Sequence, residues 1–293
     1  MSIKTILLTG ATGFLGQALI PFLLKEYKPD SIRLLGRSEW ELAKIIRQYD
    51  DLYSFKQFRP MIADIRDLPR MVSITKNVDL LIHTAALKRL EMINYCPQEG
   101  ILTNIIGSMN VLHCVINNDI PKSVWVSSDK AVAPTNLYGA TKKVMEEMVI
   151  QRSVHAQQKM ILTRYGNVCF SKGAALPYFI EKIKNNEDIP LTDERMSRFL
   201  VTKRIAIDTI KRAIGCEIQG QVVLPDELCA VNIKHMIEVL IDYYDSRSKI
   251  VIIGMFSGEK IAEEIAPGIL SDDWQYQVSN EQLIKLLKED YPL

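Results

Sequence analysis

Apolar positions along the chain fall into short runs and into longer stretches with a helical period. The short runs are rich in leucine and β-branched residues, which predicts strands at Thr5–Thr9, Ser31–Gly36, Asp79–Thr84, Ser123–Ser128 and Lys159–Tyr165. The stretches with a period of about 3.6 residues predict helices at Phe14–Lys25, Glu39–Asp50, Pro97–Asn118 and Tyr138–Ala156. This alternation is typical of an α/β protein whose parallel sheet is covered by helices on both faces.

The alternation of predicted strands and helices becomes less regular after about residue 168. Loops are expected at Ser171–Ala174 and Glu194–Arg198, and helices near Pro177–Asn185 and Ile233–Tyr244. We therefore expect a nucleotide-binding domain over residues 1–168, whose core continues with later segments. Residues 169–293 would form mainly a smaller, substrate-binding lobe.

The amino-acid composition restricts the kinds of partner that this protein is expected to bind. The chain has 293 residues with 36 basic and 35 acidic side chains, and this balance argues against binding of nucleic acid. The first apolar run, Ile6–Leu8, is too short for a signal peptide or a membrane span, so no membrane partner is expected. The five cysteines lack paired spacing, which favours reduced thiols, no metal site and a cytoplasmic location.

A glycine motif follows the first predicted strand directly. Gly10, Gly13 and Gly16 have G-x-x-G-x-x-G spacing, which suits a tight turn, close approach of a pyrophosphate and packing of the next helix. In this context the motif predicts a Rossmann-like, doubly wound sheet that binds a dinucleotide. The loop residues expected to contact the cofactor are Gly10, Thr12, Gly13, Phe14, Leu15 and Gly16.

The end of the second strand indicates which dinucleotide binds. An NAD site commonly has an acidic residue there, whereas this chain has Arg37 and Ser38, which suit the 2′-phosphate of NADP. The alternative is a surface arginine without a ligand. Further contacts are expected near the adenine and near the nicotinamide, from Asp64, Ile65, Ala85 and Ala86. His83 is interpreted as a packed residue at a strand end.

Tyr138 and Lys142 lie one helical turn apart, after the fifth predicted strand. This spacing is expected to bring the ammonium near the phenol, to lower the phenol pKa and to let Tyr138 remove a hydroxyl proton while hydride leaves the same carbon. Ser128 would supply a neighbouring hydroxyl. The arrangement predicts oxidation of an alcohol by a nicotinamide cofactor.

Asp129 and Lys130 add a second acid–base pair. An epimerase does not need such a pair, but a dehydratase does, because C5 must lose a proton and the C6 hydroxyl must leave as water. Lys130 is the candidate for proton chemistry at C5, provided that its pKa is lowered, and Asp129 the candidate at C6. The alternative is that both are solvated loop charges.

Taken together, these motifs resemble the configuration-inverting UDP-N-acetylglucosamine 4,6-dehydratases of bacterial polysaccharide and pseudaminic acid biosynthesis, which are extended short-chain dehydrogenases/reductases. The likeness spans most of the chain. Its most specific part combines Ser128-Asp129-Lys130-Ala131 with Asn136-Leu137-Tyr138-Gly139-Ala140-Thr141-Lys142. The chain departs from the family pattern at Phe256-Ser257, where Arg-Pro is common, and at Arg89, where histidine is usual.

The resemblance implies roles for individual residues. Tyr138 would be the C4 base, Lys142 its electrostatic partner, and Asp129 with Lys130 the elimination pair. Lys88 and Tyr165 would also lie at the cofactor. The substrate, UDP-N-acetylglucosamine or a related UDP-sugar, would contact Lys88, Asn167, Ser171, Pro177, Arg198 and Glu259. Relatives suggest a homo-oligomer, a hexamer.

Three other functions remain open from the sequence. Hydride could return to C4 instead of C6 and give a 5,6-unsaturated UDP-sugar. A UDP-sugar 4-epimerase would use Tyr138 and Lys142 but leave Asp129 and Lys130 idle. A regulator that binds NADP without catalysis would change no nucleotide sugar.

Overall fold

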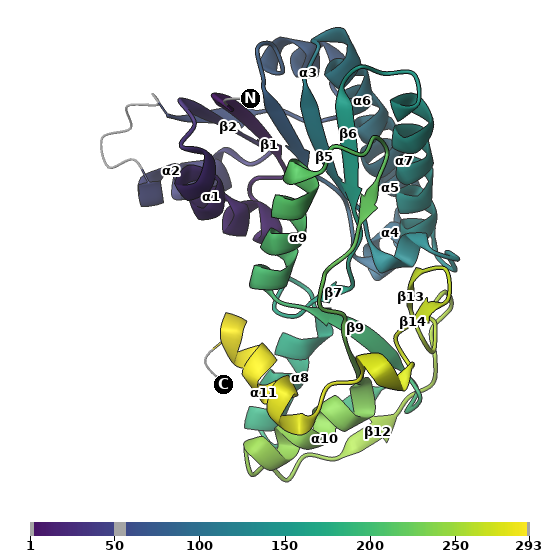
Figure 1. The fold of residues 1–293 in the computed structure, drawn as a ribbon. Helices are drawn as coiled ribbons and strands as arrows, with labels where there is room; N and C mark the ends of the chain where they lie inside the picture. Colours follow the sequence, from purple (N-terminus) through teal and green to yellow (C-terminus); the bar gives the residue numbers. More distant parts are fainter. Residues whose placement is uncertain (1–2, 50–56, 292–293) are drawn as a thin grey trace.

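A parallel sheet of seven strands forms the larger lobe of the computed structural model, which describes residues 3–49 and 57–291 (Figure 1). The strand order is β10-β6-β5-β4-β1-β2-β3, so the order reverses between β1 and β4. The strands are β1 (Thr5–Thr9), β2 (Ser31–Gly36), β3 (Phe58–Ile62), β4 (Leu80–His83), β5 (Lys122–Val126), β6 (Lys159–Thr163) and β10 (Val222–Val223). In such sheets ligands bind at the carboxyl ends of the strands, beside this reversal.

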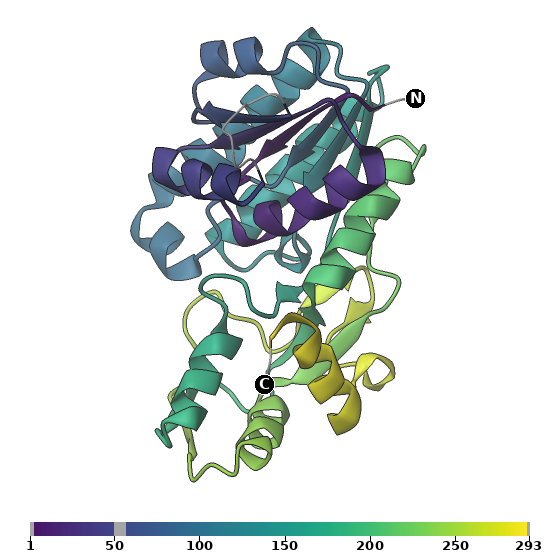
Figure 2. The same ribbon diagram turned by 90° about the vertical axis from the view of Figure 1, so that its left-hand side faces the viewer.

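Helices cover both faces of the sheet because the strands are apolar on both sides. In β1, Ile6 and Leu8 belong to the core on one face and Leu7 to the core on the other. The first core is closed by α1 (Phe14–Tyr27), α2 (Glu39–Tyr49) and α9 (Lys203–Gly215), with the purple α1 in front of the sheet in Figure 2. The second is closed by α3 (Leu68–Ile74), α6 (Ser108–Asn117) and α7 (Leu137–Ser153).

Short helices lead into α6 and α7. Before α6 come α4 (Leu90–Tyr95), α5 (Pro97–Ile101) and a π-helix (Leu102–Gly107), and before α7 comes a 3₁₀ turn (Asp129–Ala131). The π-helix contains Asn104, whose side chain bonds to both backbone groups of Leu87 and to Thr141 Oγ1 on α7. This arrangement fixes the loop after β4 against the helix that carries Tyr138.

The smaller lobe lies at the carboxyl ends of the sheet strands (Figure 1). Its strands are β7 (Asn167–Val168), β8 (Ile189–Leu191), β9 (Ser197–Val201), β11 (Cys229–Asn232), β12 (Ile250–Ile252), β13 (Glu264–Ala266) and β14 (Ile269–Leu270). Its helices are α8 (Ala175–Lys184), α10 (Ile233–Tyr243), a 3₁₀ turn (Trp274–Tyr276) and α11 (Asn280–Asp290). Between β9 and β11 the chain returns to the large lobe to add α9 and β10.

The doubly wound parallel sheet predicted from the sequence is confirmed. All five predicted strands are present, with ends within about two residues. The predicted loop at Glu194–Arg198 is wrong in its second half, because Ser197 and Arg198 pair with β11 and begin β9. The predicted helix over Pro97–Asn118 is interrupted by the π-helix, and Asp50, the expected end of α2, lies outside the described residues.

One described stretch, Pro97–Asn117, is long and apolar enough to cross a membrane by length and composition. Within the fold it contacts α3 and α7, and 56% of its apolar window is buried. A core helix passes the same test, so this feature is weak support for a membrane span.

Candidate active site

The glycine loop joins the carboxyl end of β1 to α1. Gly10 has a φ of +67°, and a Cβ there would lie 2.8 Å from the backbone nitrogen of Ala85, so the position requires glycine. Helix α1 begins at Phe14 with no acidic residue in its first turn, and Gly13 provides no side-chain cap. The amides of this turn therefore present partial positive charge to an anion, as a pyrophosphate site requires.

Two arginines lie beside the predicted ribose site. Arg37 is exposed and 3.9 Å from the carboxylate of Asp64, which also accepts from Arg66 Nε and Nη2 at 2.9 and 2.7 Å. Burial raises the pKa of Asp64, but the hydrogen bonds and charge of Arg66, with the charge of Arg37, outweigh it and lower the pKa. Ser38 accepts from the N–H of Glu41 in the first turn of α2. The sequence assigned no role to Arg66.

The loop after β4 lies next to the glycine loop. Thr84 Oγ1 donates to the carbonyl of Thr9, and the N–H of Ala85 donates to Thr9 Oγ1. Ile65 packs against Gly107 of the π-helix, and the Ile65 carbonyl accepts from Asn110. His83 is fully buried between Thr9 Oγ1 and Ser108 Oγ, at 2.8 and 3.0 Å, as expected of a packed strand-end residue.

The 3₁₀ turn after β5 holds Asp129 inside the protein. The N–H of Asp129 donates to the carbonyl of Tyr165, and Asp129 Oδ1 accepts from Ser128 Oγ at 2.9 Å and from the N–H of Lys130 at 2.8 Å. The side chain of Asp129 has no solvent exposure, and that of Lys130 is 15% exposed. The alternative of two solvated loop charges is therefore wrong.

Helix α7 brings Tyr138 against this turn. A Cβ on Gly139 would collide with the carbonyl of Lys130, so glycine allows the close approach. Burial raises the pKa of the Tyr138 phenol, and the charge of Lys130 and the nearby Ser128 hydroxyl only partly offset this effect. The expected lowering of the phenol pKa is thus not found.

Lys142 is placed differently from the sequence expectation. Its Nζ donates to the carbonyl of Val126 at 2.8 Å, and the cation that acts on the Tyr138 phenol is Lys130. Burial lowers the pKa of Lys142 to about 8, against the opposing charge of Glu146. Lys142 is therefore buried on α7, with its Nζ against the end of β5.

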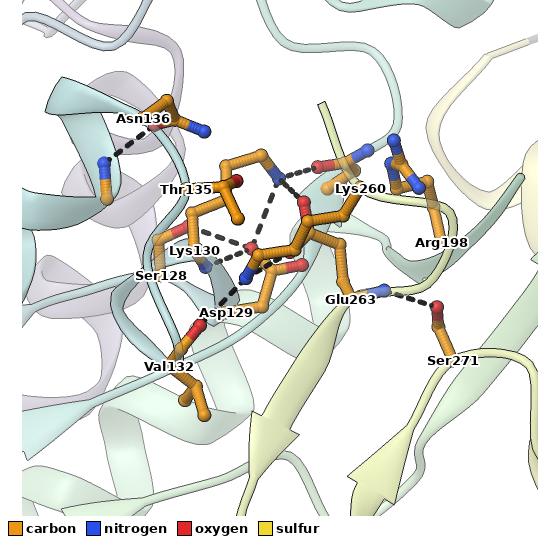
Figure 3. A network of polar contacts seen from close by, with 12 residues as sticks. Ser128, Asp129, Lys130, Val132, Thr135, Asn136, Arg198, Lys260, Glu263 and Ser271 are labelled. Carbon is orange, nitrogen blue, oxygen red and sulfur yellow. Dashed lines mark hydrogen bonds and ion pairs between the residues drawn. The ribbon is translucent and has the colours of Figure 1, made fainter. Parts of the chain in front are cut away.

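Lys130 lies at the centre of a polar network that joins both lobes (Figure 3). Its Nζ donates to Asn167 Oδ1 at 2.9 Å and to Asp129 Oδ1 at 3.2 Å, and lies 3.4 Å from Glu263 Oε1. Burial lowers the pKa of Lys130, but the charges of Asp129 and Glu263 outweigh it and raise the pKa. The lowered pKa that the sequence required of a Lys130 base is thus absent from this arrangement.

The pKa of Asp129 is also raised, which for a carboxyl group favours the protonated, neutral form. Burial raises its pKa, the nearby charge of Lys130 opposes this effect, and the net change is upward. Its Oδ2 is buried and finds no hydrogen-bond partner among residues 3–49 and 57–291. A protonated carboxyl with its second oxygen in a dry site can act as an acid.

The sequence reasoning missed Glu263, which precedes β13. Its carboxylate is 4% exposed and lies 3.3 Å from Lys260 Nζ, and Lys260 also donates to the carbonyl of Val132. Thr135 and Asn136 donate to the carbonyl of Gly258, which holds this segment beside the start of α7. The Gly258-Glu259-Lys260 motif pointed to this segment but not to Glu263.

The predicted substrate residues do not form one contact set. Lys88 donates to Ser171 at 2.9 Å, and Asn167 belongs to the Lys130 network. Arg198 donates to the carbonyls of Ser197 and Ile261, and its charge acts on Lys130 and Glu263.

The other predicted residues lie apart from this network. Glu259 accepts from the N–H of Phe256 in its own turn, while Pro177 is exposed in the first turn of α8. Tyr165 is buried, and burial raises its pKa.

The seven-stranded, doubly wound parallel sheet defines a protein with a Rossmann fold. A family model described as "Polysaccharide biosynthesis protein" matches residues 6–285. The chain belongs to this family.

Relatives and a solved structure agree with this assignment. A UDP-N-acetylglucosamine 4,6-dehydratase (inverting) of Campylobacter jejuni is 32% identical over 92% of this chain and 78% of its own. A UDP-glucose 4-epimerase of Rickettsia massiliae is 32% identical over 89% of this chain and 77% of its own. The X-ray structure of Pen from Bacillus thuringiensis has a TM-score of 0.89 at 29% identity, covering 98% of both chains.

Proposed function

We propose that this chain dehydrates UDP-N-acetylglucosamine across C5 and C6, with C5 inversion and with NADP as a bound catalyst. The observation that carries the proposal is the burial of Asp129 and Lys130 within reach of the Tyr138 phenol. Three acid–base groups thus converge on one place, whereas C4 oxidation alone needs only the phenol and its partners. The similarity to the Campylobacter dehydratase supports the same reaction.

The cofactor fits the residues of the large lobe. The amide-rich turn before α1 would hold the pyrophosphate, and Arg37 with the Ser38 hydroxyl would face the 2′-phosphate. Bound there, NADP would accept hydride from C4 and return it to C6. The protein supplies position and proton transfer.

Proton transfer follows the contacts of Ser128. Because its pKa is raised, Tyr138 rests as a neutral phenol, and its proton must first leave. Ser128, which donates to Asp129 Oδ1 and acts on the phenol, can relay that proton to the carboxylate of Asp129. The phenolate then takes the proton of the C4 hydroxyl, Lys130 removes the C5 proton, and Asp129 protonates the departing C6 hydroxyl. Water protonates C5 on the opposite face, as inversion requires, and Tyr138 and Asp129 end in the states in which they began.

Proton NMR in deuterium oxide tests the proposal. Incubation of the protein with UDP-N-acetylglucosamine and NADP should give a new methyl signal, with deuterium at C5. A pair of vinylic signals would instead indicate that hydride returns to C4 and that the product is the 5,6-unsaturated sugar. Unchanged substrate in every combination of NAD, NADP and UDP-sugar would contradict an enzymatic role.

A 4-epimerase is the second candidate, because the Rickettsia relative has the same identity to this chain. An epimerase would convert the sugar to its C4 epimer and exchange no proton at C5. In the same NMR experiment it would yield a shifted H4 signal and neither methyl nor vinylic signals. Burial of the Asp129–Lys130 pair favours dehydration over this reaction.

A further inference from the structure

Glu263 connects the smaller lobe to the acid–base groups of the larger lobe. Its Oε1 lies 3.4 Å from Lys130 Nζ and its Oε2 3.3 Å from Lys260 Nζ. The backbone of Glu263 is fixed by Ser271, whose Oγ accepts from the Glu263 N–H and whose own N–H donates to the Glu263 carbonyl, both at 2.9 Å. The side chain therefore starts from a rigid position and ends between two lysines (Figure 3).

As an ammonium, Lys130 cannot remove a proton from a sugar. An ammonium has three N–H donors and no lone pair. Two of these donors are bound to Asp129 Oδ1 and Asn167 Oδ1, and Glu263 is the next anion in reach. For Lys130 to act at C5, one of its protons must first move to an acceptor.

The groups that face Lys130 come from five elements: Asp129 from its own turn, Tyr138 from α7, Asn167 from β7, Arg198 from β9 and Glu263 before β13. Only the two carboxylates in this set can take a proton from an ammonium. Burial raises the pKa of Asp129, which suits it to hold the proton needed at C6.

Glu263 is the remaining acceptor. Burial raises its pKa, but the charges of Lys130, Arg198 and Lys260 outweigh this and keep the pKa below its usual value. It is therefore an anion at rest. A proton that reaches it is held only briefly, since the same cations favour its return to Lys130.

We propose that Glu263 is a positioning residue for the elimination, which accepts a proton from Lys130 and so frees the nitrogen lone pair that removes the C5 proton. The inference rests on the proposed dehydration. First an Nζ–H bond breaks and an Oε1–H bond forms, leaving an amine beside a carboxylic acid. The amine then takes the C5 proton, the C5–H electrons form the C5=C6 bond, and the C6–O bond breaks as Asp129 protonates the leaving oxygen. Lys130 keeps the C5 proton and is again an ammonium, water protonates C5 on the opposite face, and Glu263 gives its proton to the hydroxide left behind.

The pH dependence of the Glu263→Gln variant tests this role. In the unaltered protein the proton moves within an ion pair, so this step does not depend on pH. In the variant, Lys130 must lose a proton to water, and the dehydration rate should rise about tenfold per pH unit below the lysine pKa. Near pH 7 the rate should be about 100-fold lower, while C4 oxidation, followed by absorbance of the reduced nicotinamide, persists.

Two further variants separate this role from a structural one. Glu263→Asp should recover part of the rate and the flat profile. Glu264→Gln alters the neighbouring carboxylate, which accepts from the N–H of Gly268, and should leave rate and profile unchanged. If the pH profile of the dehydration rate in Glu263→Gln is parallel to that of the unaltered protein, the inference is overturned. It is also overturned if C4 oxidation falls as much as dehydration and the thermal midpoint is lowered.

A measurement without substrate keeps this test apart from the proposed function. The Lys130 signal, assigned by Lys130→Arg in protein labelled with ¹³C-lysine, should titrate at lower pH in Glu263→Gln, since a neighbouring anion is lost. An unchanged titration would refute the Lys130–Glu263 coupling even if the protein dehydrates UDP-N-acetylglucosamine. A shifted titration in a protein that forms no methyl product would refute the proposed function alone.

Discussion

The guanidinium of Arg164 and the carboxylate of Glu146 form a two-pronged ion pair, with Nε–Oε1 and Nη2–Oε2 distances of 3.0 and 2.6 Å. Arg164 Nη1 also donates to the carbonyl of Ile265 in β13 at 2.9 Å. Arg164 follows β6 and Glu146 lies on α7. One side chain therefore connects the sheet, the helix that carries Tyr138 and the segment that carries Glu263.

Loss of Glu146 should destabilise the protein strongly. In Glu146→Ala the Arg164 charge stays buried without its partner, so the free energy of unfolding should fall by about 3–5 kcal/mol. Urea unfolding followed by circular dichroism measures this change. The control is Glu147→Ala on the same helix, because the Lys143–Glu147 pair is 47% exposed on both sides and should contribute less than about 1 kcal/mol. Similar losses in the two variants would contradict the prediction.

The sequence predicts the sheet because its signals are local. Apolar runs, glycine spacing and helical periods each lie within one element, and β1, β2 and α1 are recovered closely. Strand β3 has Arg59 and Pro60 in its middle, and β10 has two residues, so neither has a recognisable apolar run. Their pairing is decided by neighbouring strands.

The sequence predicts only those site residues that lie close to one another along the chain. Tyr138, Asp129 and Lys130 are found because they lie on one turn and the following helix. Glu263 comes from a distant segment, and its contact with Lys130 exists only after the smaller lobe has packed. The pKa directions of Lys130 and Tyr138 differ from expectation for the same reason, since burial and Glu263 determine them.

His83 should make stability depend on acidity. Burial, with the nearby charge of Lys142, lowers the pKa of His83 to about 3. Below pH 6.5 the unfolded chain binds a proton that the folded protein excludes, so stability falls as pH decreases, by about 1.4 kcal/mol per unit until pH approaches 3. Urea unfolding of His83→Gln between pH 6.5 and 4 should show a flatter slope. The control is His113→Gln, which replaces an exposed histidine and should keep the slope of the unaltered protein. If His83→Gln also keeps that slope, the argument is refuted.

Arg37 should determine preference between the two nicotinamide dinucleotides. Replacement by alanine removes a charge that would pair with the 2′-phosphate, so NADP affinity should fall about 10- to 100-fold while NAD affinity changes little. Fluorescence titration with both dinucleotides measures the two dissociation constants. Lys44→Ala, which removes a nearby cation paired with Glu41, serves as the control. If both affinities fall equally, Arg37 contributes to the fold of the site and not to recognition of the phosphate.

Lys130 and Tyr138 should act in different steps of the reaction. Lys130→Ala removes the proposed C5 base, so water loss should be abolished while partial C4 oxidation survives. Tyr138→Phe removes the proposed C4 base, so both steps should fall by at least about 100-fold. Rapid mixing with UDP-N-acetylglucosamine would separate the two, since reduced nicotinamide should accumulate only in Lys130→Ala. Because Lys130 also neutralises Asp129 and Glu263, the thermal midpoint of its variant should be measured alongside. Dehydration at an unaltered rate in Lys130→Ala would leave the buried pair without a catalytic role and favour the epimerase.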